Sequence, residues 1–139
     1  MKKISLKGMS NKMKVVLAGG LVVLIGIGSL VGVSYKQAKE EIQAVELIQT
    51  SEFNGWDGEI GAKFNQFLEN EEWYSEVEDG NTYVYCKGSG YVYNTRMDLL
   101  FKFYVNTEQG NFELVKTYRN GQECNEIEED DILYEIFGY

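Results

Sequence analysis

The feature that most constrains this chain is an uncharged apolar stretch near its N-terminus. From Val15 to Val33, nineteen consecutive residues are Val, Leu, Ile, Ala or Gly, with a single Ser among them. At about 1.5 Å of rise per helical residue, a stretch of this length crosses a bilayer core of roughly 30 Å. The sequence therefore predicts one transmembrane helix over residues 15–34, which contacts the lipid bilayer through residues 15–33.

The charges on either side of this stretch predict its orientation. Residues 1–14 carry five lysines and no acid, whereas the rest of the chain holds 8 basic and 22 acidic side chains, a charge of −14 within a total of −9. Short basic flanks stay on the cytoplasmic side of a membrane. We therefore expect a cytoplasmic tail over residues 1–14 and an acidic domain outside the plasma membrane. Such a domain repels phosphates, so we expect no nucleic-acid partner.

A cleavable signal peptide is the competing interpretation of the same stretch. Its signature is a basic segment, an apolar segment and small residues at a cleavage site, and Gly32-Val33-Ser34 fits the last of these. The apolar segment of a signal peptide is usually roughly 7 to 15 residues long, which favours a retained anchor here. Cleavage would instead produce a secreted protein.

Helical spacing continues after the apolar stretch. Ala38, Ile42, Val45 and Ile48 recur at intervals of four, three and three residues, which predicts a juxtamembrane helix over residues 35–50. Residues 51–139 then form the predicted extracytoplasmic domain. This domain begins with a second helix, from residue 59 to about residue 70, whose apolar residues are Ile60, Phe64, Phe67 and Leu68.

Strand and turn signals dominate the middle of the domain. Leu99, Phe101, Phe103 and Val105 alternate with other residues, which is the period of a half-buried strand. We expect an α+β fold with an antiparallel meander sheet of four to five strands and helices packed on one face. The expected strands are 73–77, 82–87, 91–105 with a bend at 94–98, 112–118 and a short return at 122–124; the expected turns are 79–81, 88–90 and Asn120-Gly121.

A capping box predicts the last helix. Asn125 is followed three residues later by Glu128, and an apolar stripe of Ile132, Leu133, Ile136 and Phe137 comes next. The acids in the first turns compensate the helix dipole, and they lack the spacing of a calcium-binding EF-hand loop. We therefore expect no metal site there.

The order of these elements resembles a small extracytoplasmic domain of uncharacterised membrane-anchored or lipoprotein-like proteins of Gram-positive bacteria. The resemblance covers about the last 80 residues. It implies an α+β domain displayed outside the membrane and brings no known activity with it. The residues that carry it are Ile60-Gly61, Phe64, Phe67, Leu68, Trp73, Phe101-Lys102-Phe103, Phe112, Asn120-Gly121 and Leu133 to Phe137.

A membrane helix that runs into a longer helix and then an antiparallel sheet is also similar in outline to pilins and pseudopilins. Those proteins carry a glutamate early in the apolar segment, and residues 15–33 contain none. A structural, pilin-like subunit is therefore an alternative with less support.

Catalytic chemistry has little support in this composition. The chain has no histidine, which removes the commonest general base and the imidazole metal ligands. A carboxylate-dependent hydrolase could use Glu69, Glu71, Glu72 and Glu76, which lie beside Trp73 and Tyr74. Neighbouring acids are expected by composition alone, because the chain contains seventeen glutamates. We expect no catalytic residue, no cofactor and no enzymatic activity.

Two cysteines, Cys86 and Cys124, lie on the predicted outer side of the membrane. An extracytoplasmic location permits a disulfide between them, which would stabilise the domain by roughly 3 to 4 kcal/mol in the chain-entropy model. Two unpaired cysteines at core positions are the alternative.

Tyrosines on neighbouring strands are the best indication of a binding surface. Tyrosine combines apolar area with a polar tip and is common where proteins meet partners. Our main hypothesis is a membrane-anchored extracytoplasmic interaction module that contacts an envelope protein or polymer through the sheet face without helices. Alternatively, these tyrosines are ordinary large residues of a half-buried sheet. The candidate residues are Tyr83, Tyr85, Tyr91, Tyr93, Tyr104 and Tyr118.

Overall fold

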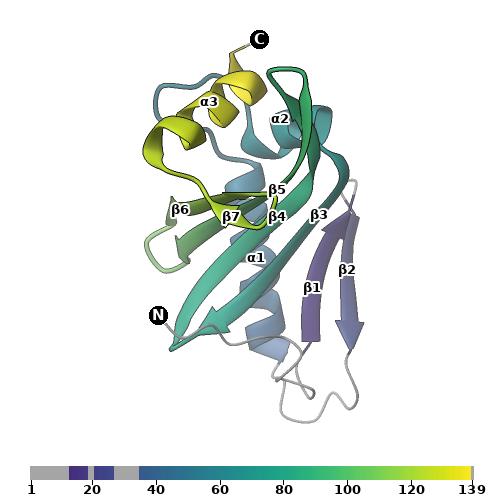
Figure 1. The fold of residues 1–139 in the computed structure, drawn as a ribbon. Helices are drawn as coiled ribbons and strands as arrows, with labels where there is room; N and C mark the ends of the chain where they lie inside the picture. The colour runs from purple at the N-terminus through teal and green to yellow at the C-terminus, as the bar shows by residue number, and fades with distance from the viewer. Residues whose placement is uncertain (1–12, 19–20, 27–34, 139) are drawn as a thin grey trace.

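The structure, a computed structural model, describes residues 13–18, 21–26 and 35–138 (Figure 1). Its centre is an antiparallel sheet in which each strand pairs with the strand that follows it in the chain. This arrangement confirms the predicted α+β fold with an antiparallel meander. The five strands are β3 (Glu69–Glu78), β4 (Asn81–Val92), β5 (Thr95–Asn106), β6 (Asn111–Arg119) and β7 (Gln122–Glu123).

Three helices pack on one face of this sheet and form the main core with it (Figure 1). They are α1 (Tyr35–Gln49), α2 (Ile60–Phe67) and α3 (Glu126–Phe137). Phe64 of α2 packs against Trp73 of β3 and Phe101 of β5, with ring centroids 5.8 and 4.6 Å away. Because side chains alternate along a strand, the residues between these core positions point to the opposite face.

Two hairpin turns and one helix cap that the sequence predicts are present in the structure. Asp79 and Asn120 adopt the left-handed backbone conformation that a tight hairpin requires, with φ of 50° and 47°, and each is followed by a glycine. At the start of α3, the Glu128 amide donates to Asn125 Oδ1 at 2.8 Å, and the Asn125 amide donates to Glu128 Oε1 at 3.0 Å. The predicted capping box is therefore confirmed.

The predicted turn at Gly88-Ser89-Gly90 is wrong, because β4 runs through these residues without a break. A Cβ atom at Gly88 would lie 2.9 Å from Leu68 Cβ and 3.0 Å from the Glu69 carbonyl oxygen. The glycine is there because the α2–β3 connection passes close to the strand. The chain reverses instead at Tyr93 and Asn94, whose φ angles are 49° and 64°.

The structure also has two N-terminal strands, β1 (Met13–Ala18) and β2 (Leu21–Gly26), which pair with each other. β1 also pairs with β3, where Val16 lies opposite Tyr74 and Leu17 opposite Trp73. Short apolar runs such as Val15 to Ala18 and Leu21 to Gly26 are compatible with a buried strand as well as with a helix. The rest of the predicted membrane helix, residues 19–20 and 27–34, and residues 1–12 of the basic tail lie outside the described residues. The membrane helix therefore stays a prediction.

No helix among the residues that the structure describes is long and apolar enough to cross a bilayer. The predicted juxtamembrane helix over residues 35–50 corresponds to α1, whose Val45 and Ile48 enter the main core. The helical spacing of these residues is thus explained by packing on the chain's own domain.

Candidate functional site

Four of the six candidate tyrosines share the sheet face that lies opposite the helices. Tyr83 of β4 pairs with Tyr104 of β5, and Tyr118 of β6 pairs with Leu100 of β5. Tyr85 lies between Tyr74 of β3 and Lys102 of β5. We call this surface the tyrosine face; it consists of Tyr74, Tyr83, Tyr85, Leu100, Lys102, Tyr104 and Tyr118.

The tyrosine face contains a second, smaller hydrophobic cluster. Tyr85 is only 1% exposed, and its ring stacks on that of Tyr74 with centroids 4.9 Å apart and planes 8° apart. Tyr83 is also buried, and its ring lies 5.8 Å from that of Tyr104. Tyr83 and Tyr85 therefore fit the alternative interpretation, in which they are packing residues. Tyr104 and Tyr118 are half-buried and offer accessible area on this face.

The other two candidates lie at the end of β4 and are exposed. Tyr91 lies opposite Arg96 of β5. Tyr93 is in the β4–β5 turn, and its hydroxyl donates to Asp131 Oδ1 of α3 at 3.2 Å. Because this bond directs Tyr93 toward the helices, the structure separates Tyr93 from the tyrosine face.

A buried ion pair that sequence reasoning missed lies within the tyrosine face. Lys102 Nζ donates to Glu78 Oε2 at 3.1 Å, and Tyr85 Oη donates to Glu78 Oε1 at 2.9 Å. The Lys102 ammonium also lies 4.4 Å from the centroid of the Tyr83 ring, within the range of a cation–π contact. The alternation of Phe101, Lys102 and Phe103 was a usable signal, since it places Lys102 on the face opposite the core.

These surroundings raise the pKa of two phenols of the tyrosine face, Tyr74 and Tyr85. Burial raises the pKa of Tyr85 far above its ordinary value, and the hydrogen bond to Glu78 raises it further. Burial also raises the pKa of Tyr74, with a smaller contribution from the negative charge of Glu76. Both hydroxyl groups are therefore hydrogen-bond donors at neutral pH.

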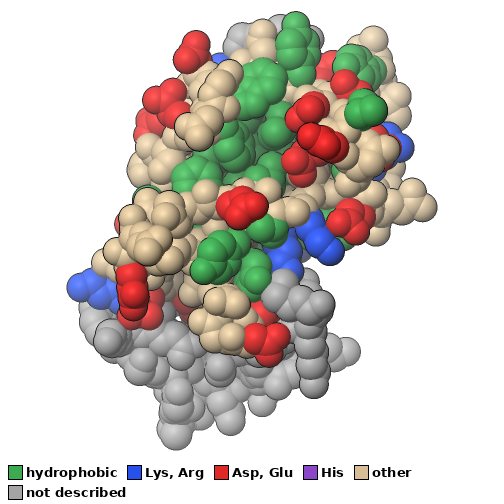
Figure 2. All heavy atoms as spheres, turned by 90° about the vertical axis from the view of Figure 1, so that its left-hand side faces the viewer, with side chains coloured by type: hydrophobic (Ala, Val, Ile, Leu, Met, Phe, Trp, Pro, Cys, Tyr) green, Lys and Arg blue, Asp and Glu red, His purple; other side chains and the backbone are tan. Residues whose placement is uncertain are grey.

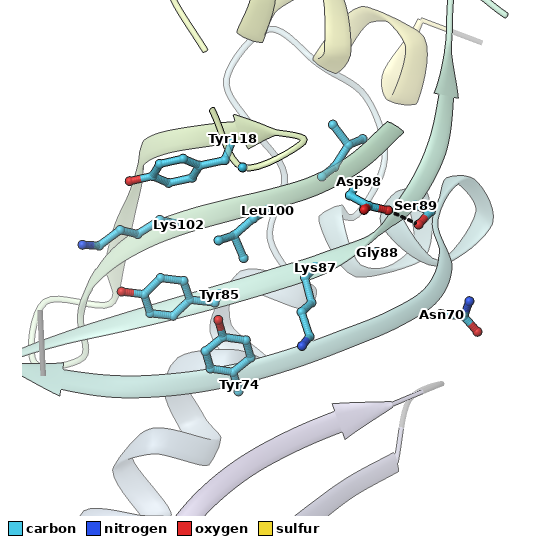
Figure 3. Close-up of a pocket in the computed structure, with 12 residues that line it drawn as sticks. Asn70, Tyr74, Tyr85, Lys87, Gly88, Ser89, Asp98, Leu100, Lys102 and Tyr118 are labelled. Carbon is cyan, nitrogen blue, oxygen red and sulfur yellow. Dashed lines mark hydrogen bonds between the residues drawn. The ribbon is translucent and has the colours of Figure 1, made fainter. Parts of the chain in front are cut away.

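A hollow of about 640 Å³ opens on the tyrosine face (Figure 3). Tyr74, Tyr85 and Tyr118 supply aromatic rings to its lining, while Lys87 and Lys102 contribute cationic side chains. Figure 3 shows Ser89 and Asp98 at the opposite end from these rings, where Ser89 Oγ donates to Asp98 Oδ1 at 2.8 Å. Its remaining lining residues are Asn70, Gly88, Leu99, Leu100 and Gly121. The hollow combines apolar area with hydrogen-bonding groups, as ligand sites do.

The four carboxylates considered for hydrolysis do not converge on one point. Glu71 accepts a hydrogen bond from the indole of Trp73 at 2.9 Å, so it lies toward the helices. Glu72 pairs with Lys87 at 3.3 Å on the other face, and Glu69 pairs with Arg96 at 2.6 Å. Glu76 is buried opposite Tyr83. Among the described residues, no group of three or more His, Cys, Asp or Glu side chains is placed to hold a metal ion.

The two cysteines are free thiols in the structure. Cys86 pairs with Phe101, Phe101 pairs with Thr117, and the amide of Cys124 donates to the Thr117 carbonyl at 2.8 Å. Three strand spacings, or roughly 14 Å, therefore separate the two cysteine backbones. A disulfide requires Cα atoms about 4.4 to 6.8 Å apart. The strand register therefore places the two cysteines too far apart for the disulfide that the sequence permits, and both are free in this structure.

Comparison with protein-family models, with curated proteins and with solved structures found no match to this chain. The resemblance to the extracytoplasmic domains of Gram-positive bacteria therefore stays a prediction that rests on the residues given above.

Proposed function

We propose that this chain is a membrane-anchored extracytoplasmic interaction module, which contacts an envelope protein or polymer through the hollow of the tyrosine face. The observation that carries this proposal is the hollow itself, because it joins aromatic rings, Leu100 and two lysines on a sheet face that no helix of the described residues covers. Aromatic rings with polar tips supply contact area and directed hydrogen bonds together.

The anchoring part of the proposal rests on the sequence. The uncharged stretch from Val15 to Val33 is preceded by five lysines and followed by an acidic domain. This distribution favours a cytoplasmic N-terminus and an external domain.

Non-covalent recognition fits the side chains of the hollow better than catalysis does. Lys102 and Tyr85, its most deeply buried polar groups, are both bonded to Glu78. A general base must reach a proton of the substrate, and a nucleophile must reach its reactive atom. Lys102 and Tyr85 instead direct their polar atoms to Glu78. Tyr118 is half-buried and Lys87 is exposed although it pairs with Glu72, so both offer accessible area to a partner.

Site-specific photo-crosslinking tests the proposal. A benzophenone amino acid is placed at position 118 in the hollow or, as a matched control, at position 127 on α3, where Ile127 is exposed. Cells that produce the full chain are irradiated, and the crosslinked products are compared by gel and mass spectrometry. We expect a discrete product from position 118 that position 127 does not give.

A second variant tests whether the crosslinked product depends on the hollow and not only on the reactivity of the benzophenone group. Leu100 lies beside Tyr118 across β5 and β6, so Leu100→Lys places a charge in the hollow. We expect this change to suppress the product from position 118. Equal products from both positions, or no effect of the Leu100 substitution, would contradict the proposal.

A further inference from the structure

A second surface lies on the side of the molecule where β6 and α3 meet. One part of it is the outer edge of β6, which is only partly paired. Among the described residues, β7 pairs with the outer edge of β6 only at Tyr118 and Arg119, and the amide of Cys124 adds one bond to the Thr117 carbonyl. The edge from Asn111 to Lys116 has no strand beside it in the part of the chain that the structure describes. Backbone groups on such an edge are a template for a further strand.

A β-bulge limits the part of this edge that can accept a strand. Leu114 pairs with Phe103 and Lys116 with Lys102, so Val115 is the extra residue on β6. Bulges twist an edge and interrupt regular pairing. The regular part of the free edge is therefore Asn111 to Leu114, which is long enough for a short extended segment.

A groove with both apolar and polar lining residues runs beside this free edge on the helix face. Its volume is about 640 Å³, and its lining comes from β6, from the loop before α2 and from α3. The ring of Phe53 forms part of this lining, and its centroid lies 6.2 Å from that of Phe112 and 5.5 Å from that of Phe137 beneath. The apolar lining residues are Phe53, Trp56, Phe112, Leu114 and Leu133.

The charged residues that line this groove are acidic in the described part of the chain. They are Glu52, Glu113 and Glu129, and none of the described lysines or arginines lines it. Figure 2, which views the molecule from this side, shows hydrophobic side chains between acidic ones. Glu52 is bonded to the Gly58 amide, and Glu129 accepts a bond from Thr117 Oγ1. Glu113 is exposed at the free edge and pairs with Tyr104, so its side chain points to the face opposite the groove, where the alternate side chains of an added strand would lie.

We propose that this surface binds an extended segment of a partner protein in which apolar residues alternate with lysine or arginine. The segment adds to the sheet as a strand along residues 111–114, and its apolar side chains enter the groove beside Phe112 and Leu114. Backbone bonds to an exposed edge supply affinity in this mode, while pockets for alternate side chains supply specificity. The lysine or arginine residues of such a segment then lie on the same face as Glu113, which selects them by charge complementarity. The groove that takes the apolar side chains lies on the helix face, opposite the tyrosine face.

A blocked heptapeptide, Lys-Val-Lys-Leu-Lys-Val-Lys, is a direct probe of this surface. It is titrated into the full chain in a zwitterionic detergent while tryptophan emission is recorded. Trp56 lines the groove and is half-buried, whereas Trp73, the other tryptophan, is 1% exposed in the core. We expect saturable binding that changes the emission and a response that Trp56→Phe abolishes.

Three comparisons separate strand addition from non-specific attraction. We expect the matched peptide with glutamate in place of lysine to show no binding, and the basic peptide with N-methylated backbone amides to bind far more weakly. Glu113→Lys should weaken binding of the basic peptide about fivefold or more, since an attraction between exposed charges becomes a repulsion. Glu40→Lys makes the same charge change at an exposed position of α1 and should leave affinity unchanged.

Several results would overturn the proposal. These are no saturable response with any peptide, equal binding of the N-methylated peptide, or equal effects of the substitutions at Glu113 and Glu40. Sedimentation of the wild-type chain adds one more test. A dimer that Glu113→Lys dissociates would show that a second copy of this chain, and not a basic partner segment, occupies the edge.

Discussion

Lys102 is a cation held at 7% exposure on a sheet face made largely of tyrosine rings. Its partner Glu78 is 0% exposed, so both charges have lost most of their hydration. The desolvation of a buried ion pair offsets most of the attraction between its charges, but removal of one partner leaves the other charge unpaired. Glu78 also accepts from Tyr85, so the loss of Glu78 would leave a buried hydroxyl without its acceptor.

Substitution of this pair should therefore give strongly non-additive effects. We expect Lys102→Met alone to lower the free energy of unfolding by about 3 to 5 kcal/mol, because it leaves Glu78 buried and unpaired. The double variant Glu78→Gln with Lys102→Met should cost much less, since the amide oxygen can still accept from Tyr85. Denaturant unfolding of the wild type, both single variants and the double variant measures the coupling. Additive free energies in this cycle would show that the two charges do not act together.

At the scale of the elements, β4 is the central strand of the sheet. It pairs along its length with β3 and β5, and it carries core residues on one side and Tyr83 and Tyr85 on the other. Gly88 and Gly90 lie at the end where α2 and the start of β3 pass over the strand. They allow a close approach that a side chain would prevent.

These two glycines should respond differently to the same substitution. A Cβ atom at Gly88 would meet the Leu68 Cβ and the Glu69 carbonyl, which cannot move without the backbone, whereas one at Gly90 would meet the side-chain ring of Phe67. We expect Gly88→Ala to destabilise the domain by about 1 to 3 kcal/mol and Gly90→Ala to cost less. Thermal and denaturant unfolding of both variants checks this. Equal costs, or a stable Gly88→Ala variant, would contradict the close approach.

The same elements show which parts of the fold the sequence could predict. Features that depend on near neighbours in the chain could be predicted from a few consecutive residues. Examples are the alternation of Leu99, Phe101 and Phe103 and the capping pair Asn125 and Glu128. The predicted turn at Gly88 is wrong because this glycine allows the close approach of Leu68, which lies twenty residues earlier in the chain. The residues next to Gly88 in the sequence contain no information on such a contact.

The candidate site was harder to predict because it depends on strand register. Tyr85 is buried, and the register places Tyr74 and Lys102 directly opposite it on two other strands. Tyr104 and Tyr118 are only half-buried at comparable positions. The composition of the tyrosine face was thus predictable from the alternation, whereas the burial of each ring and the hollow between them were not. The distance between Cys86 and Cys124 was set by register in the same way.

At the scale of the whole molecule, buried phenols and a buried thiol determine the response to alkaline pH. Burial raises the pKa of Tyr74, Tyr83 and Tyr85 above the ordinary 10.0, and burial raises the pKa of the Cys86 thiol well above 9.0. The unfolded chain loses these protons at the ordinary values, while the folded chain keeps them to higher pH. Unfolding therefore releases protons in this range, and the stability falls as pH rises.

We expect the free energy of unfolding to decrease progressively from about pH 9 to pH 11 as the unfolded chain ionises. Tyr74→Phe removes one of the titrating groups from the tyrosine face, so its decrease should be shallower. Denaturant midpoints at half-unit intervals of pH measure both slopes. A wild-type stability that is constant or rises across this interval would contradict the burial of these groups.

The order of the strands has a consequence for how the domain acquires its structure. β3 to β7 lie side by side in the order in which they occur in the chain, and their connections are two to four residues long. Sheets built from such local pairings fold faster than sheets that join distant segments, because little loop entropy is lost before each contact forms. A chain that crosses a membrane with its N-terminus held behind would present its strands one after another, each next to the partner it needs. With the membrane anchor that we propose, the sheet would form during export, before α3 completes the core.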